Sequence, residues 1–120
     1  MLTNGITFQA IDWSNIEKIV QLYESASVSQ QTISFKGLRI RMVEYFPGYI
    51  ADHWCRKGHI VHCLKGSIVS ELETGEFVSL SEGMSYVVSD NMSSHRSLSK
   101  NGVTLLIIDG DFLQEPKTAN

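Results

Sequence analysis

The sequence predicts an all-β fold of the sandwich or barrel type, and two observations lead to this prediction. From residue 32 onward, short apolar stretches follow one another closely, and some alternate strictly between apolar and polar residues, as "SIVSELE" does at 67–73. Most of these stretches end at a turn signal that contains glycine, for example Pro47-Gly48 or Thr74-Gly75. Short strands at close spacing with turn signals between them are typical of β-sandwiches and β-barrels.

The first third of the chain admits two interpretations. "TFQAIDW" at 7–13 is expected to be extended, and "SASVSQQ" at 25–31 is expected to be a loop. Between them, Ser14 and Glu17 fit a capping box, and apolar residues follow at helical spacing, which predicts a helix. The same valine, isoleucine and tyrosine residues also favour a strand, so a short helical turn that leads into a strand is the alternative.

The remaining elements are all predicted strands. They cover residues 32–35, 38–46, 51–55, 59–64, 67–73, 76–80, 84–89, 95–99 and 103–109. Lys65-Gly66 is expected to be a turn between two of them, and Asn101-Gly102 carries a hairpin signal. We therefore expect a single domain over 1–120, with a barrel core at about 32–109, an N-terminal extension at 1–31 and a short C-terminal tail at 110–120.

Composition limits the classes of partner. Of the 120 residues, 42% are hydrophobic and 19% are charged, and the formal net charge is −3. The lysines and arginines form no dense block, so no nucleic-acid partner is expected. No apolar run approaches the roughly 18 residues that a membrane-spanning helix needs, so no membrane partner is expected either. The N-terminus does not read as a secretory signal, and there are only two cysteines, which predicts a cytoplasmic protein with both thiols reduced.

The stretch "IADHWCRKGHIVHCLKG" at 50–66 contains three of the four histidines and both cysteines. His53 and Cys55 are two residues apart, so on an extended strand they would face the same cavity. His59 follows a turn and could return to the same place, and His95 begins a late strand. Imidazole and thiolate are ligands that zinc and the later first-row metals prefer. These four residues are the predicted ligands of one divalent transition metal, which could be zinc, iron, nickel or copper.

Other residues near these positions have weaker signals. His62 has the opposite parity to His59 and should face the other side of the sheet, and Cys63 is expected to pack in the core. Arg39 and Arg41 share one strand face, which is expected to be solvated. Three residues are candidates for the surroundings of the site, each with a simpler alternative. They are Asp52 as a hydrogen-bond partner of a ligand histidine or a turn residue, Tyr86 as a cavity or core residue, and Arg96 as an anchor for an anionic substrate or a surface ion-pair partner.

The region from Gly48 to His95 resembles the two motifs of the cupin superfamily. His53 takes the first histidine position of motif one, Cys55 the second and His59 the glutamate position, and Gly66 follows at the motif spacing. Gly83 and His95 begin and end the looser second motif, which is one residue longer than usual. The order Asp-His-Trp-Cys at 52–55 is similar to that of small cupins named for an Asp-His-Cys-Trp motif. The resemblance implies a jelly-roll-like β-barrel with a metal site, and it implies no particular reaction.

The departures from the motif leave several functions open. A cysteine replaces a histidine and a histidine replaces the glutamate, so the set is softer than the usual one. Four ligands would make a closed, structural site, whereas three would leave a position open for substrate. If the protein is an enzyme, the range of reactions that the resemblance implies is that of a metal-dependent oxygenase, isomerase or lyase acting on a small molecule. The alternatives are a non-catalytic binding module and a metal-free structural barrel, and a homodimer is expected in any of these cases.

Overall fold

The protein is almost entirely β in the computed structural model, which describes residues 5–114. The expected all-β fold is confirmed, while most of the expected C-terminal tail lies outside the described residues. In chain order the elements are the 3-10 helix η1 (Trp13–Asn15), strands β1 (Ile19–Leu22), β2 (Ser27–Phe35), β3 (Leu38–Tyr45), β4 (Tyr49–Ile50), β5 (His59–Leu72), β6 (Phe77–Ser81), β7 (Ser85–Val88), β8 (His95–Ser99) and β9 (Val103–Gly110), and the 3-10 helix η2 (Asp111–Leu113).

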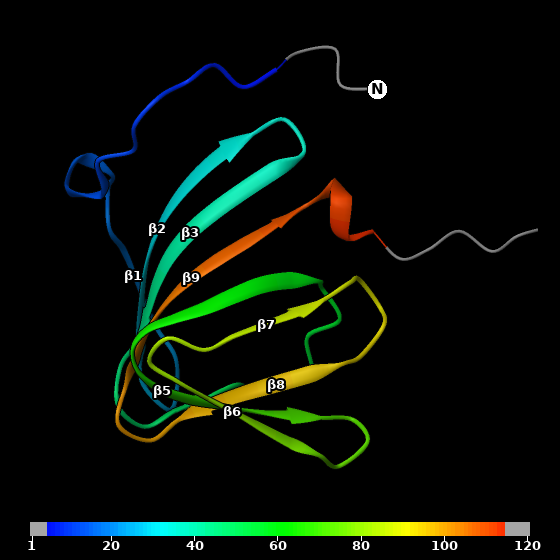
Figure 1. The fold of residues 1–120 in the computed structure, drawn as a ribbon. Helices are drawn as coiled ribbons and strands as arrows, with labels where there is room; N and C mark the ends of the chain where they lie inside the picture. The colour runs from blue at the N-terminus through cyan, green and yellow to red at the C-terminus, as the bar shows by residue number, and fades with distance from the viewer. Residues whose placement is uncertain (1–4, 115–120) are drawn as a thin grey trace, which may run out of the picture.

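The strands form one antiparallel sheet that curls into a half-barrel (Figure 1). The order across the sheet is β1-β2-β3-β9-β5-β8-β4, and β6 and β7 also pair with β5. Alternation places one side of each strand inside the curl, as along β9, where every second residue from Val103 to Asp109 is buried. The core consists of Val28, Val43, Val61, Cys63, Ile68, Leu80, Val103, Leu105 and Ile107.

Strand β5 runs without a break through the Lys65-Gly66 dipeptide, so the turn predicted there is wrong. The pairing with β9 is irregular between Cys63 and Lys65, and Gly66 has a φ of +81°. A Cβ at Gly66 would overlap the carbonyl oxygen of Gly102. The glycine therefore bends the strand instead of ending it. The first half of β5 pairs with β7 and β9, and the second half pairs with β6 and β8.

The N-terminal region follows the second of its two interpretations. Asp12 caps η1 by accepting hydrogen bonds from the backbone and side chain of Ser14, and β1 then begins at Ile19. The predicted helix is thus replaced by a single turn that leads into a strand. The loop predicted at 25–31 is also wrong, because β2 begins at Ser27 and pairs with both β1 and β3. The serine and glutamine residues of this segment give no apolar alternation in the sequence, although Val28 and Ser29 are buried in the structure.

Two other connections differ from expectation. Asn101-Gly102 does not form a hairpin, because β8 pairs with β4 and β5 while β9 pairs with β3 and β5. The strand predicted at 51–55 lies earlier, at Tyr49–Ile50, and Cys55 forms only an isolated bridge with His95. Within residues 5–114, no helix is both long enough and apolar enough to cross a membrane.

Candidate metal centre

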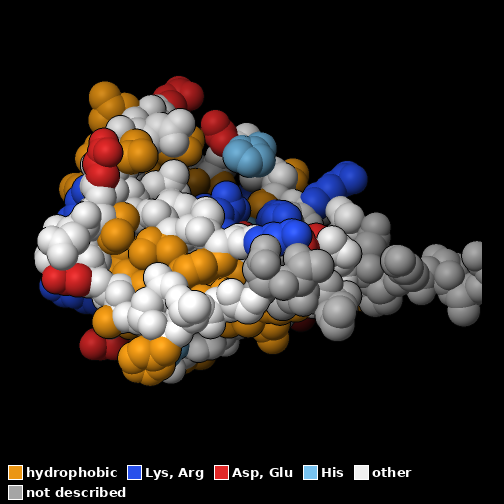
Figure 2. Space-filling view, turned by 90° about the horizontal axis from the view of Figure 1, so that it is seen from above, with side chains coloured by type: hydrophobic (Ala, Val, Ile, Leu, Met, Phe, Trp, Pro, Cys, Tyr) orange, Lys and Arg blue, Asp and Glu red, His pale blue; other side chains and the backbone are white. Residues whose placement is uncertain are grey.

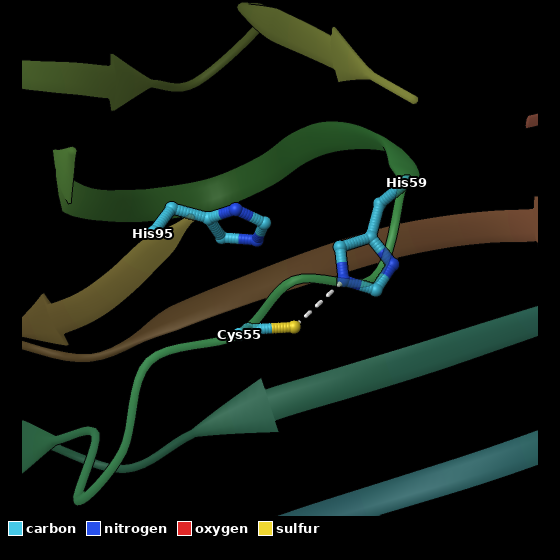
Figure 3. Close-up of side chains that lie close together, drawn as sticks. All are labelled: Cys55, His59 and His95. Carbon is cyan, nitrogen blue, oxygen red and sulfur yellow. Dashed lines mark hydrogen bonds between the residues drawn. The ribbon is translucent and has the colours of Figure 1, made fainter. Parts of the chain in front are cut away.

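Cys55, His59 and His95 come together at one end of the half-barrel, where their ligand atoms all lie within 4.8 Å of one another. Figure 3 shows Cys55 and His59 on one stretch of the chain and His95 on another, with the three side chains pointing toward one another. The sulfur of Cys55 lies 3.6 Å from Nε2 of His59. The rings of His59 and His95 meet edge to face, with centroids 5.6 Å apart.

The backbone explains why these residues meet. His59 is the first residue of β5, and His95 is the first residue of β8 and pairs with Leu72 at the other end of β5. Two backbone hydrogen bonds tie Cys55 to His95, one of 2.7 Å from the Cys55 N–H and one of 3.0 Å from the His95 N–H. The curl of β5 and this bridge therefore bring together residues that are 40 positions apart in the sequence.

The ring of His95 is held in one tautomer by a backbone group. Its Nδ1 lies 3.1 Å from the carbonyl oxygen of Ser93. Because a carbonyl oxygen can only accept a hydrogen bond, Nδ1 must carry the proton. In the neutral ring the lone pair is then on Nε2, and a neutral imidazole with one nitrogen fixed in this way is the form that binds metals.

A buried carboxylate lies behind His59. The ring Nδ1 is 3.5 Å from Oδ2 of Asp109, and it has no hydrogen-bond partner among residues 5–114. Asp109 is 3% exposed, and it accepts two hydrogen bonds from Arg39 and one from Arg41. Burial alone would raise the pKa of Asp109, but the hydrogen bonds and charges of the two arginines lower it overall. A carboxylate behind a histidine is the usual arrangement for orienting a metal-binding imidazole.

The surroundings of Cys55 favour the thiolate. Hydrogen bonding with His59 first, and then with His95, lowers the pKa of the Cys55 thiol from 9.0 to about 5, against the opposing effect of burial. The hydrogen bond with Cys55 in turn raises the pKa of His95. Thiolate is the form of cysteine that binds metals, and a metal bound here would displace the proton that the imidazoles hold toward the sulfur.

The fourth expected ligand, His53, lies outside this group. Its side chain is 77% exposed, and its Nδ1 lies 2.6 Å from Oδ1 of Asp52, which is 71% exposed. Strand alternation would place His53 beside Cys55, but residues 52 and 53 form a bend and not a strand. Asp52 thus contacts a histidine, as one alternative expected, but that histidine is not one of the three that converge.

A cavity of about 300 Å³ opens next to the three residues. Six of the seven residues singled out from the sequence line it, namely His53, Cys55, His59, Tyr86, His95 and Arg96. The ring of Tyr86 packs edge to face against His95. Arg96 also donates a 2.7 Å hydrogen bond to Glu71 and lies over the ring of Trp54, so both of its expected roles are compatible with its position.

Two arginines on β3 were not predicted to belong to the site. Arg39 and Arg41 were expected to face solvent, but both side chains line the cavity and pair with Asp109. Their positions in the strand could have predicted this placement, because Arg39 and Arg41 lie on the same strand face as Val43 and Tyr45, which also face the interior. His62 behaves as expected: it contacts Ser85 rather than the converging residues, with Nδ1 2.7 Å from the Ser85 hydroxyl.

No protein-family model matches the chain, and no curated protein matches its sequence. Several solved structures do resemble it. A sugar phosphate isomerase of the cupin superfamily from Silicibacter pomeroyi has a TM-score of 0.68 at 14% identity, over 85% of this chain and 75% of its own. KdgF from Halomonas sp. has a TM-score of 0.67 at 16% identity, over 87% of this chain and 94% of its own. An RmlC-like cupin from Shewanella frigidimarina has a TM-score of 0.65 at 15% identity, over 87% of this chain and 91% of its own. These structural similarities show that the chain has the cupin fold.

Proposed function

We propose that this chain, which has the cupin fold, binds one divalent transition metal through Cys55, His59 and His95. The observation that carries the proposal is the convergence of one thiol and two imidazoles within 4.8 Å. One thiolate and two neutral imidazoles form a soft donor set that suits zinc, iron(II), nickel or copper. His53, on the rim of the same cavity, has no ligand role in this proposal.

Three protein ligands favour an enzyme over a storage or structural site. Catalytic zinc sites commonly have three protein ligands and keep one position for water or substrate, whereas structural sites have four. A metal held here would supply Lewis-acid or redox chemistry to a small molecule in the adjacent cavity. The chain's own residues would position that molecule: Tyr86 forms part of the wall and Arg96 lies at the cavity, while the Asp109 carboxylate lies 3.5 Å behind the His59 ring.

The structural neighbours support an activity on small molecules, since one of them is described as a sugar phosphate isomerase. A non-catalytic metal-binding module is the second candidate, and the exposed His53 beside the cavity is the observation that favours it. If His53 turned inward it would complete a four-ligand site. The coordination number of the bound metal, measured by X-ray absorption spectroscopy, separates the two candidates.

Three further proposals concern the setting of the protein. The sequence Asp-His-Trp-Cys at 52–55 supports a place near the small cupins with an Asp-His-Cys-Trp motif. The two free cysteines support a reducing compartment such as the cytoplasm. We also expect a homodimer, which light scattering would detect as a particle with twice the 13.4 kDa mass of the chain.

Metal analysis of the purified protein tests the central proposal. We expect about one transition metal per chain in the wild type, and loss of most of it in both His59→Ala and His95→Ala. His62→Ala is the matched control, because this histidine lies on the same strand as His59 but contacts Ser85. His53→Ala is expected to keep its metal. Full occupancy in His59→Ala and His95→Ala would contradict the assignment.

A further inference from the structure

The cavity beside the three converging residues is lined by cations. Arg39, Arg41, Lys57 and Arg96 all contribute to its wall, and none of its lining residues within 5–114 is an aspartate or a glutamate. The chain as a whole carries a net charge of −3, so this concentration of positive charge is local. On the face seen in Figure 2, several Lys and Arg side chains gather beside a histidine ring. Apart from the Cys55 thiolate, the charged side chains of the wall are all cationic, and a concave site with an excess of one sign of charge attracts small molecules of the opposite sign.

Not all of these cations are equally available to a ligand. Arg96 is paired with Glu71, and Arg39 directs two hydrogen bonds to Asp109. Arg41 donates from Nη2 to Asp109, and its Nε is buried away from any ligand, but the side chain still lines the cavity with the rest of its guanidinium group. A guanidinium group has five N–H donors in a planar fork, which matches a carboxylate or a phosphate. Arg41 therefore keeps donors for a ligand.

Arg41 is also placed next to the candidate metal centre. Oδ2 of Asp109 lies 3.2 Å from Nη2 of Arg41 and 3.5 Å from Nδ1 of His59. A single carboxylate oxygen thus separates the guanidinium from one of the proposed ligands. The side chain of Arg41 is 18% exposed, so water weakens its interactions much less than at an open surface.

We propose that Arg41 binds the anionic group of a small molecule, a carboxylate or a phosphate, while another part of that molecule faces Cys55, His59 and His95. This inference deepens the proposed function and rests on it for the role of the bound molecule as a substrate. Tyr45, on the same face of β3, lines the same cavity. Burial raises the pKa of Tyr45 to about 12, so its hydroxyl stays protonated and can donate a hydrogen bond to an anion. A volume of about 300 Å³ suits a small molecule.

Calorimetric titration of the metal-free protein tests the anion site separately from the metal. The probes are malonate, inorganic phosphate and malonamide, which is the neutral counterpart of malonate. We expect one or both anions to bind, and malonamide to bind at least about tenfold more weakly than the better anion, because it lacks the charge that strengthens hydrogen bonds to a guanidinium. The stronger of the two anions identifies the carboxylate or the phosphate as the preferred group. If neither anion binds more tightly than malonamide, the proposal is wrong.

A pair of arginine variants tests the residue. Arg41→Gln is expected to weaken binding of the preferred anion about tenfold or more, and Arg56→Gln makes the same change in charge at an exposed residue that does not line the cavity. Equal effects of the two variants would overturn the assignment to Arg41. The metal content of Arg41→Gln is expected to match that of the wild type. If the wild-type protein binds the anions but no metal, the proposed function is refuted and the anion site still stands.

A measurement on the unaltered protein covers the case in which Arg41→Gln does not fold. Phenylglyoxal modifies accessible arginines, and mass spectrometry locates the modified residues. We expect the preferred anion to protect Arg41 at least about fivefold relative to malonamide, because an anion in the guanidinium fork blocks the reagent. Arg56 should react equally in both cases. Equal modification of Arg41 with the anion and with malonamide would overturn the proposal.

Discussion

At the scale of single residues, the two cysteines show how surroundings set the chemistry of one side chain. Cys55 is half-buried beside two imidazoles, and the pKa of its thiol falls to about 5. Cys63 is fully buried, and its sulfur lies near the backbone carbonyl oxygens of Lys65 and Gly66. Burial raises the pKa of the Cys63 thiol. The first cysteine is therefore suited to bind a metal, and the second to fill space in the core.

This contrast leads to a test of the thiolate ligand. In the cobalt-substituted protein, sulfur-to-cobalt charge-transfer absorption in the near ultraviolet should be lost in Cys55→Ser and kept in Cys63→Ala. We also expect Cys55→Ser to bind zinc about tenfold or more less tightly, because a hydroxyl is a poorer ligand than a thiolate. Unchanged absorption in Cys55→Ser would show that the sulfur does not bind the metal.

Tyr45 makes a prediction about alkaline pH. Burial raises its pKa from 10.0 to about 12, so the unfolded chain releases this proton at a lower pH than the folded chain. Its contribution to stability is present below pH 10 and is lost as the pH rises toward 12, and it amounts to at most about 3 kcal/mol. Urea unfolding should show a smaller loss of stability between pH 9 and pH 11.5 in Tyr45→Phe than in the wild type. Parallel losses in the two proteins would contradict this account.

At the scale of elements, the bend in β5 determines the shape of the sheet. The strand changes neighbours near Gly66, where the backbone has a positive φ and passes close to Gly102. The residues before the bend pair with β7 and β9, and those after it pair with β6 and β8. The bend therefore lets one strand carry His59 at its start and pair with His95 at its end.

Two glycine variants separate the effect of the bend from the effect of the backbone angle. Gly75 has a φ of +94°, and no atom of the described residues lies within 4 Å of the position that an added Cβ would take. Gly75→Ala should therefore cost only the angle, about 1–2 kcal/mol. Gly66→Ala adds an overlap with Gly102 and should cost about 3 kcal/mol or more. Urea unfolding measures both, and equal costs would show that the close approach at Gly66 is relieved without penalty.

The sequence predicted most strands but few of the places where they connect. Burial alternates along β9 and toward both ends of β5, because these stretches have one face in the interior, and the turn signals that flank the apolar stretches indicate the other strands. The glycine in Lys65-Gly66 looks the same in sequence whether a strand ends or bends there. What differs is the approach of Gly102, a contact between residues far apart in the chain. For the same reason, Asn101-Gly102 signals a turn without revealing that the two flanking strands have different partners.

The sequence predicted part of the candidate site but not all of it. Cys55, His59 and His95 could be named from residue type and motif spacing, and the structure brings them together. The placement of His53 required residues 51–55 to be extended, and the bend at 52–53 prevents this. Asp109 had no local signal at all. It ends an apolar run and becomes part of the site only because β9 pairs with β3 and β5.

At the scale of the whole molecule, a metal would join distant parts of the half-barrel. Cys55 and His59 lie before and at the start of β5, and His95 lies at the start of β8. Free zinc at about one hundred times its dissociation constant should therefore stabilise the folded protein by about 2.7 kcal/mol and raise the melting temperature by several degrees. A chelator should reverse the shift. The double variant His59→Ala/His95→Ala should melt at the same temperature with and without zinc, and a shift in that variant would point to a different site.

The sharing of β5 between both halves of the curl has a consequence for how the protein opens. In a sandwich whose two sheets share no strand, one sheet can detach while the other stays folded. Here neither half can separate without breaking the hydrogen bonds of a common 14-residue strand. The amide hydrogens in the middle of β5 should therefore exchange with solvent only when the entire molecule unfolds. Within residues 5–114, β1 pairs only with β2, and its four residues are all exposed, so its amides should exchange through local fraying.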